Sequence, residues 1–175
     1  VIKEMTEAVH AARKHGIKVT GFLYGYTYLE NFSIEHPFTR GVHYIELDRD
    51  AVDALRNTQG VVLHNARANP GGAVKHWNDL ADPQKNRKLV NIFQAFEHLA
   101  IDALVSIGGD DTLKTANFLQ RIQTVVSGLR PVKIVHVPKT IDNDYHGIDW
   151  TFGFFSAAEY AAHSIRNLMA DSFTS

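Results

Sequence analysis

Two segments in the second half of the chain each combine an apolar strand with a polar loop that follows it directly. The first, Ala103–Thr112, passes from apolar residues into a Gly-Gly-Asp-Asp turn and then into a helical pattern. The second, Val132–Asp144, ends in Pro-Lys-Thr-Ile-Asp-Asn-Asp. In open α/β sheets, ligands bind outside the carboxyl ends of the strands. The pattern therefore predicts buried strands whose carboxylate-rich loops, Gly108–Thr112 and Lys139–Asp144, face one cleft.

The first of these loops combines features of a phosphate site and of a metal site. Gly108 and Gly109 permit positive φ and let the backbone approach a ligand closely. The helix that follows offers unpaired N–H groups to a phosphate. Asp110 is a hard oxygen ligand of the kind that Mg²⁺ takes together with phosphates and water. The alternative is purely structural, with Asp110, Asp111 or Thr112 capping a helix that starts near Thr112.

The second loop adds groups suited to proton transfer. If this loop is extended, Thr140, Asp142 and Asp144 share one face. A carboxylate in a cleft can take a proton from a sugar hydroxyl, and a like charge nearby raises a carboxyl pKa toward a useful range. The neighbouring Lys139 can offset charge on a phosphoryl group in transit. The alternative is an ordinary Asx-rich surface turn. The two loops together favour chemistry over this structural alternative.

Three motifs in this region closely resemble the phosphofructokinase family. They are the turn Gly108–Thr112, the run Pro138–Asp144 and the downstream segment Gly147–Gly153. A Gly-Gly-Asp turn is weakly specific, because lipid kinases and NAD kinases carry one too, whereas the other two motifs together are much more specific. The resemblance is densest over residues 103–170 and looser upstream.

The resemblance implies a fold and a domain organisation. We expect an α/β, three-layer Rossmann-like domain with a mainly parallel sheet. Residues 1–153 would form a donor-binding domain that lacks its first strand and glycine turn. Residues 154–175 would form a helix leading toward an absent sugar-phosphate domain. Because those two parts are missing, we expect the 175-residue chain to be inactive by itself.

The resemblance also implies a reaction, a phosphoryl transfer to the 1-hydroxyl of fructose 6-phosphate in glycolysis that gives fructose 1,6-bisphosphate. Asp142 would be the general base, and Lys139 would stabilise charge on the transferring group. Asp110 would hold Mg²⁺. The expected contacts to the phosphoryl donor are Gly108, Gly109, Asp111 and Arg67, and those to the sugar are Thr140, Ile141, Asp142 and Asp144.

Two positions distinguish phosphoryl donors within the family. ATP users typically carry glycine where this chain has Asp111 and Lys139, although some ATP-using branches keep the lysine, and pyrophosphate users usually carry both residues. A carboxylate at position 111 fills and repels the space that a third phosphate needs. We therefore predict a reversible, pyrophosphate-dependent enzyme. The alternatives are an ATP-dependent enzyme that tolerates Asp111 and a non-catalytic regulatory subunit of one.

Composition narrows the expected partners and location. The formal net charge of −1 gives no basic field for nucleic acid or for an anionic membrane, and no apolar run is long enough to span a bilayer. The absence of cysteine fits a reducing compartment, so we expect a cytoplasmic protein. The ten histidines include no HExxH pattern, which argues against zinc. By resemblance we also expect a homo-oligomer.

The remaining patterns predict the outline of the α/β domain. Tyr26 matches the glycine-tyrosine segment of the family, although packing is the alternative role for a tyrosine in an aromatic loop. His64 or Asn65 replaces the usual glycine ahead of Arg67, which puts the backbone geometry there in question. Helices are expected over residues 2–15, 50–57, 112–126 and 154–169 and from Pro83 to about Leu99, and short strands at 17–23, 44–47 and 61–63.

Overall fold

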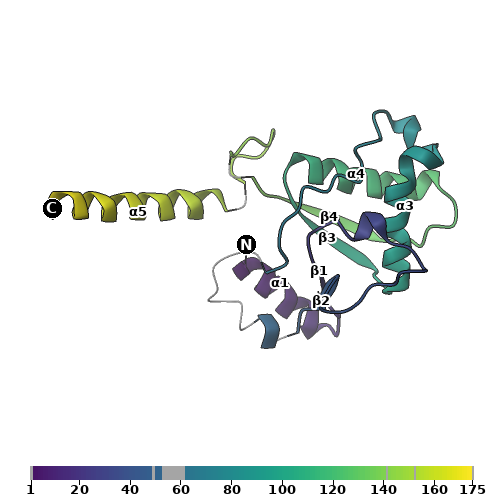
Figure 1. Ribbon diagram of the computed structural model, residues 1–175, viewed down its shortest axis with the longest axis horizontal. Helices are drawn as coiled ribbons and strands as arrows, with labels where there is room; N and C mark the ends of the chain where they lie inside the picture. The colour runs from purple at the N-terminus through teal and green to yellow at the C-terminus, as the bar shows by residue number, and fades with distance from the viewer. Residues whose placement is uncertain (1, 49, 53–61, 141, 152, 175) are drawn as a thin grey trace.

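The structure, a computed structural model, describes residues 2–48, 50–52, 62–140, 142–151 and 153–174 (Figure 1). Long helices alternate with short strands along this part of the chain. The elements, in chain order, are α1 Ile2–Lys14, β1 Thr20–Phe22, η1 Leu29–Asn31, β2 Tyr44–Glu46, η2 Trp77–Ala81, α3 Pro83–His98, β3 Ala103–Gly108, α4 Asp110–Val125, β4 Lys133–Pro138 and α5 Phe154–Thr174. None of the described helices is both long enough and apolar enough to cross a membrane.

Strands β3 and β4 form a parallel pair, with α4 as the connection between them. The register aligns Ala103 with Lys133 at one end and Gly108 with Pro138 at the other. Parallel strands need a crossover of this kind because a tight turn cannot bring the chain back to the starting edge. The α/β class with a parallel sheet is therefore confirmed, and the two predicted loops leave the same edge.

A second, antiparallel pair is formed by β1 and β2. The expected strand at 17–23 is confirmed only over Thr20–Phe22, and the edge strand at 44–47 over Tyr44–Glu46. The strand expected at 61–63 is wrong for its described part, because residues 62 and 63 form a turn. Leu63 instead accepts a hydrogen bond from Tyr24 N at 2.8 Å, outside the β1–β2 ladder. Val61 and most of the helix expected at 50–57 lie outside the described residues.

The main core lies where α3 and α4 pack together against the β3–β4 pair (Figure 1). Asp82 caps α3 by accepting a hydrogen bond from Gln84 N at 2.9 Å, and Pro83 begins the helix, as predicted. The apolar stripe of α3 is buried together with two residues of α4. The fully or almost fully buried members of this group are Leu89, Ile92, Phe93, Phe96, Leu119 and Ile122.

The predicted burial of the two parallel strands is wrong for one face. The strands β3 and β4 are not buried on both faces, since Val105 is 62% exposed and Val135 is 59% exposed, while Leu104 and Ile134 on the opposite face pack against the core. Leu113, in the first turn of α4, is also 37% exposed. Helix α4 covers one face of this pair, so the apolar run of each strand is divided between an inner and an outer face.

Helix α5 extends away from the rest of the molecule (Figure 1). Much of its apolar surface is exposed, as shown by side chains including Phe155, Ile165, Met169 and Phe173. The predicted helix at 154–169 is thus confirmed and continues to Thr174. The division of the chain at residue 153 stays a prediction.

Two leucines on α4 offer a matched test of where the core lies. We expect Leu119→Ala to lower the free energy of unfolding by about 2–5 kcal/mol, because it opens a cavity in a closed core. Leu119 has no exposed surface, whereas Leu113 is 37% exposed. Leu113→Ala should therefore cost clearly less in urea-induced unfolding. Equal losses from the two variants would contradict this assignment of the core.

Candidate active site

Hydrogen bonds onto the Gly108 carbonyl hold the two predicted loops side by side. Lys139 N donates to Gly108 O at 2.8 Å, directly after the strand register ends at Pro138. The Tyr145 hydroxyl donates to the same oxygen at 3.0 Å. A carbonyl oxygen has two lone pairs, so one atom can accept both bonds. The loop after β3 and the loop after β4 therefore meet at Gly108.

The first loop places two carboxylates in the first turn of α4. Gly109 is the N-cap residue and makes no side-chain cap, while Asp110 and Asp111 both lie inside the helix. The alternative that one of these side chains caps the helix is therefore wrong. Both carboxylates are largely exposed and face Lys114, whose ammonium lies 2.5 Å from Asp110 Oδ2 and 3.9 Å from Asp111 Oδ1. The hydrogen bond that Lys114 donates to Asp110, together with the charges of both carboxylates, raises the pKa of Lys114.

The glycine at position 108 is required by space rather than by backbone conformation. Gly108 lies in β3, and Gly109 has φ −82°, so the predicted use of positive φ is wrong for this turn. A Cβ at position 108 would lie 2.5 Å from Thr112 Oγ1 and 2.8 Å from Thr112 Cβ. Such distances are too short for any side chain to be accommodated without movement. The sharp passage from strand to helix thus depends on the missing side chain.

The second loop is closed by internal hydrogen bonds that keep it from being extended. Asn143 adopts φ +52°, which ends the strand alternation that was expected to align Thr140, Asp142 and Asp144. Its amide accepts from Thr151 N at 2.7 Å and donates to Asp149 O at 3.0 Å. The Thr151 hydroxyl donates to Thr140 O at 2.8 Å, and Thr151 is buried.

This closed loop leaves its acidic side chains at the surface. Asp142 and Asp144 are exposed, and Asp142 N donates to Thr140 Oγ1 at 3.2 Å. Lys139 is also exposed, so its main chain is fixed to Gly108 while its ammonium remains available. Ile141 lies outside the described residues.

Tyr145 and His136 are residues whose place in the site the sequence reasoning missed. The Tyr145 hydroxyl bonds to Gly108, and His136 Nε2 lies 3.4 Å from the same hydroxyl. Burial raises the pKa of Tyr145, and the charges of Asp110 and Asp144 raise it further. The nearest signal in the sequence is an aromatic residue directly after the acidic run, which by itself does not indicate a contact with the other loop.

Two upstream candidates differ in their surroundings. The Tyr26 hydroxyl lies 3.0 Å from Ser106 Oγ, and the ring packs against the main core, as in the packing alternative. Burial raises the pKa of Tyr26. Arg67 is exposed on an irregular segment. His64 has φ +58°, which is a conformation that glycine adopts at no steric cost, and its ring stacks on Tyr24 at 4.6 Å.

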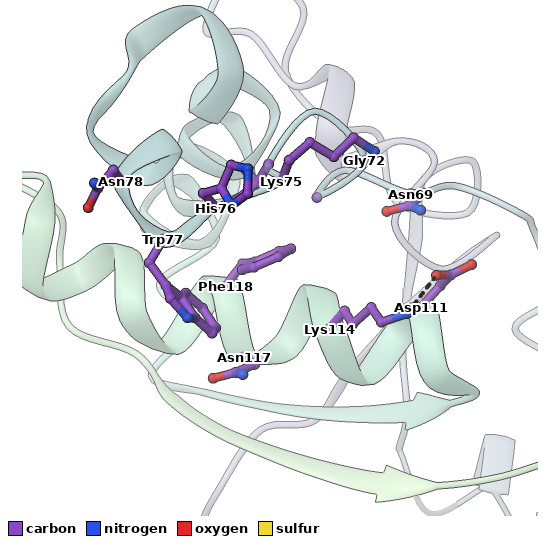
Figure 2. A pocket seen from close by; sticks show the side chains of 12 residues that line it. Asn69, Gly72, Lys75, His76, Trp77, Asn78, Asp111, Lys114, Asn117 and Phe118 are labelled. Carbon is purple, nitrogen blue, oxygen red and sulfur yellow. Dashed lines mark ion pairs between the residues drawn. The ribbon is translucent and has the colours of Figure 1, made fainter. Parts of the chain in front are cut away.

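A groove of about 690 Å³ runs along α4 from the first loop (Figure 2). Asp111 and Lys114 lie at one end, and the aromatic side chains of Trp77 and Phe118 lie further along it. The guanidinium of Arg121 lies 3.9 Å from the centre of the Trp77 ring, which holds the indole in place. The sequence reasoning missed this groove because it depends on a long-range approach of residues 69–78 to α4.

Asp79 fixes the groove wall that carries Trp77. Its carboxylate accepts hydrogen bonds from the main-chain nitrogens of Lys75 and His76 at 2.8 and 2.9 Å and pairs with Lys85 Nζ at 2.6 Å. The hydrogen bond from Lys85 and those from the backbone hold the pKa of Asp79 well below its usual range. The negative charge therefore persists at neutral pH and keeps this wall ordered.

The donor atoms at this edge fit a magnesium site of the kind that relies on substrate oxygens. Within the described residues, no three acidic or histidine side chains gather into a metal cluster. Mg²⁺ commonly takes only one or two carboxylates and completes its shell with phosphates and water. Asp110 offers one exposed carboxylate, for which a cation would compete with Lys114.

A family model described as phosphofructokinase matches residues 3–175. The chain is 30% identical over 174 residues to ATP-dependent 6-phosphofructokinase 2 of Clostridium perfringens, covering 96% of this chain and 40% of that protein. It is 33% identical over 166 residues to pyrophosphate–fructose 6-phosphate 1-phosphotransferase of Naegleria fowleri, covering 93% and 32%.

Solved structures show the same fold. Phosphofructokinase from Saccharomyces cerevisiae matches with a TM-score of 0.71 and 19% identity, over 98% of this chain and 22% of that one. Pichia pastoris phosphofructokinase in the T-state matches with a TM-score of 0.70 and 20% identity, over 95% and 17%. The phosphofructokinase fold predicted from the sequence is thereby confirmed. The chain spans two fifths or less of the two curated relatives described above.

Asn143 provides a test of how the second loop is held. Asn143→Ala removes both side-chain hydrogen bonds, leaves the buried Thr151 N without its acceptor and places alanine at φ +52°. We expect a loss of about 1–3 kcal/mol in the free energy of unfolding. Hydrogen exchange over residues 142–151 should also accelerate. Asn167→Ala on the exposed face of α5 is the control, and an effect of similar size there would refute the role of Asn143.

Proposed function

The chain belongs to the phosphofructokinase family, and we propose that it is the donor-binding part of an enzyme that transfers a phosphoryl group from pyrophosphate to fructose 6-phosphate. The observation that carries the proposal is the meeting of the two loops at Gly108. The two loops carry Asp110, which is suited to bind a metal, Lys139, and Asp142, which is suited to act as a base, at the same edge of the sheet. Phosphoryl transfer depends mainly on positioning and electrostatics, which such an arrangement supplies.

The proposed chemistry begins at Asp142. Its carboxylate takes the proton from the 1-hydroxyl of fructose 6-phosphate as that oxygen attacks a phosphorus of pyrophosphate. The bond to the bridging oxygen breaks, and orthophosphate leaves with that electron pair. In the reverse direction Asp142 returns the proton. An exposed carboxylate on a closed loop can meet the sugar directly, with Thr140, Ile141 and Asp144 as its neighbours in the sequence.

The lysine and the first loop act on the phosphates. The hydrogen bond from Lys139 N to Gly108 O fixes the backbone of Lys139. Its ammonium can then stabilise the negative charge that develops on the transferring phosphoryl group. Gly108 and Gly109 shape the seat of the donor, and the exposed Arg67 is a further proposed contact to it. Asp110 would hold Mg²⁺, which supplies positive charge to the phosphate oxygens when it is bound.

Asp111 supports the choice of pyrophosphate. The Lys114 ammonium lies 2.5 Å from Asp110 but 3.9 Å from Asp111, so the charge of Asp111 is the less compensated of the two. An uncompensated carboxylate beside the donor seat repels the additional phosphate of a nucleotide. A diphosphate has no further phosphate that would need the space beside Asp111.

ATP is the second candidate donor, and the groove along α4 favours it. Its volume of about 690 Å³ lies within the usual range of small-molecule sites. It begins at Asp111 and is lined by aromatic rings at Trp77 and Phe118, which could stack on a base (Figure 2). Proteins named ATP-dependent 6-phosphofructokinase also occur among the relatives, in Clostridium perfringens and in Streptomyces coelicolor.

Further parts of the proposal concern the complete protein. We propose that residues 1–153 form the donor-binding domain and that residues 154–175 lead toward the sugar-phosphate domain. The assembly would be a cytoplasmic homo-oligomer. A non-catalytic regulatory subunit is the remaining alternative, and Mg²⁺-dependent turnover by the complete protein would eliminate it.

The role of Asp142 can be tested in the complete enzyme with Asp142→Asn, which keeps the shape of the side chain and removes the base. We expect turnover to fall by about 10²–10⁴-fold, the range for a lost general base. Pyrophosphate binding, measured by calorimetry, should change little. Glu159→Gln on the exposed face of α5 is the matched control for the change from carboxylate to amide. Near-normal turnover of Asp142→Asn would remove Asp142 from this role.

Donor choice can be tested with Asp111→Gly in the complete enzyme. Removing the carboxylate should raise the ratio of the ATP rate to the pyrophosphate rate by roughly tenfold or more, because one repulsive contact is lost. The measurement is kcat/KM with each donor under saturating fructose 6-phosphate and Mg²⁺. An unchanged ratio would show that Asp111 does not select the donor.

A further inference from the structure

Tyr145 joins the two loops through its side chain. It belongs to the loop after β4, yet its hydroxyl donates at 3.0 Å to the carbonyl of Gly108, the last residue of β3. The other side-chain bonds described for this loop remain within it. They run from Thr151 to Thr140, from Asp142 N to Thr140 Oγ1, and between Asn143 and residues 149 and 151. Those internal bonds shape the loop, whereas the Tyr145 bond sets where the loop lies relative to its neighbour.

His136 supports Tyr145 from β4. Its Nε2 lies 3.4 Å from the Tyr145 hydroxyl, and the two rings lie 6.4 Å apart. The Tyr145 hydroxyl donates its single hydrogen to Gly108 O, so towards His136 it acts as an acceptor. His136 must then carry its ring proton on Nε2. His136 Nδ1 is buried and has no hydrogen-bond partner within the described part of the chain. A side chain that served packing alone at position 136 would not need to bury a polar nitrogen without a partner.

The surroundings of Tyr145 keep it a hydrogen-bond donor. Burial raises its pKa, and the charges of Asp110 and Asp144 raise it further. The two carboxylates lie on the two different loops, and the charge of each favours the neutral phenol. Burial also lowers the pKa of His136, an effect that the backbone of Gly108 partly opposes, and the neutral imidazole is favoured at neutral pH.

We propose that Tyr145, held by His136, is a positioning residue that sets the distance between the Asp110 loop and the Asp142 loop. This inference rests on the proposed phosphoryl transfer, in which both carboxylates serve one reaction. The hydroxyl fixes the position of the second loop by its hydrogen bond to the carbonyl at the start of the first. A reaction slows greatly when its reacting groups are held slightly out of place. The single hydrogen bond from Tyr145 to Gly108 O therefore affects turnover.

The first experiment uses Tyr145→Phe in the complete enzyme, which removes the hydroxyl and keeps the ring. We expect kcat to fall by roughly 10-fold to 100-fold, the range for a small misplacement of reacting groups. Both KM values should stay within about twofold, because the residues proposed to contact the ligands are unchanged. Tyr160→Phe, on the exposed face of α5, is the matched control and should leave kcat unchanged.

A double-mutant cycle separates positioning from general packing. His136→Leu should lower kcat about as much as Tyr145→Phe, and the double variant should be no slower than either single one, because both remove the same tie. His136→Gln retains a donor that can reach the phenol and should restore most of the lost rate. Additive losses, or no recovery with glutamine, would overturn the inference.

Hydrogen exchange gives a readout that does not require activity. The hydrogen bond from Tyr145 to Gly108 O also protects the Lys139 amide, which donates to the same carbonyl. Amide exchange in segment 138–145 should therefore be faster in Tyr145→Phe and unchanged in Tyr160→Phe. Unchanged exchange together with unchanged kcat would reject the positioning role while leaving the proposed function intact. A wild-type enzyme inactive with both donors would instead reject the proposed function and with it a catalytic purpose for the tie.

Discussion

The site depends on one carbonyl oxygen, that of Gly108. It accepts the Lys139 amide as the last bond between two parallel strands and the Tyr145 hydroxyl as the first bond beyond them. Parallel strands can bring two loops to one edge, but they do not determine how far apart the loops then lie. The carbonyl does so here, because bonds from both the main chain and a side chain of the second loop end on it. Crowding by Thr112 excludes a side chain at this position, so the residue that supplies the carbonyl has to be glycine.

The parts of the fold that could be predicted from the sequence are those with local causes. The start of α3 follows from an aspartate that caps it and a proline that tolerates the first turn, and its buried stripe follows from helical spacing. The end of α1 is similar, since Gly16 has φ +72° and closes the helix. The parallel pairing of β3 and β4 was predicted because both strands are apolar and are separated by a helix. For the two helices the residues that decide the structure are neighbours in the chain, and for the strand pair the deciding signal is the apolar composition of each strand.

The parts that failed depend on contacts between distant residues or on alternatives of nearly equal local energy. The shared face of Thr140, Asp142 and Asp144 was considered for an extended loop. The backbone of Asn143 instead turns to φ +52°, and its amide makes two hydrogen bonds with residues further along the chain. Asn is one of the residues that tolerate this region, so the sequence permitted both outcomes. The groove along α4 depends on Asp79 ordering the wall that carries Trp77, and no periodic pattern reports such an arrangement.

Lys114 links the proposed metal site to the choice of donor. With no cation bound, its ammonium pairs mainly with Asp110 and only loosely with Asp111. A divalent cation on Asp110 would displace that ammonium, and the nearest remaining carboxylate is Asp111. Once Lys114 pairs with Asp111, the repulsion that Asp111 exerts on a nucleotide is reduced, because opposite charges at short range cancel much of their field. Under the proposed function, any discrimination against ATP would therefore depend on the position of Lys114 when Mg²⁺ is bound as well as on Asp111. Through such a movement of Lys114, an aspartate at position 111 would be compatible with the neighbouring groove along α4, which is large enough for a nucleotide.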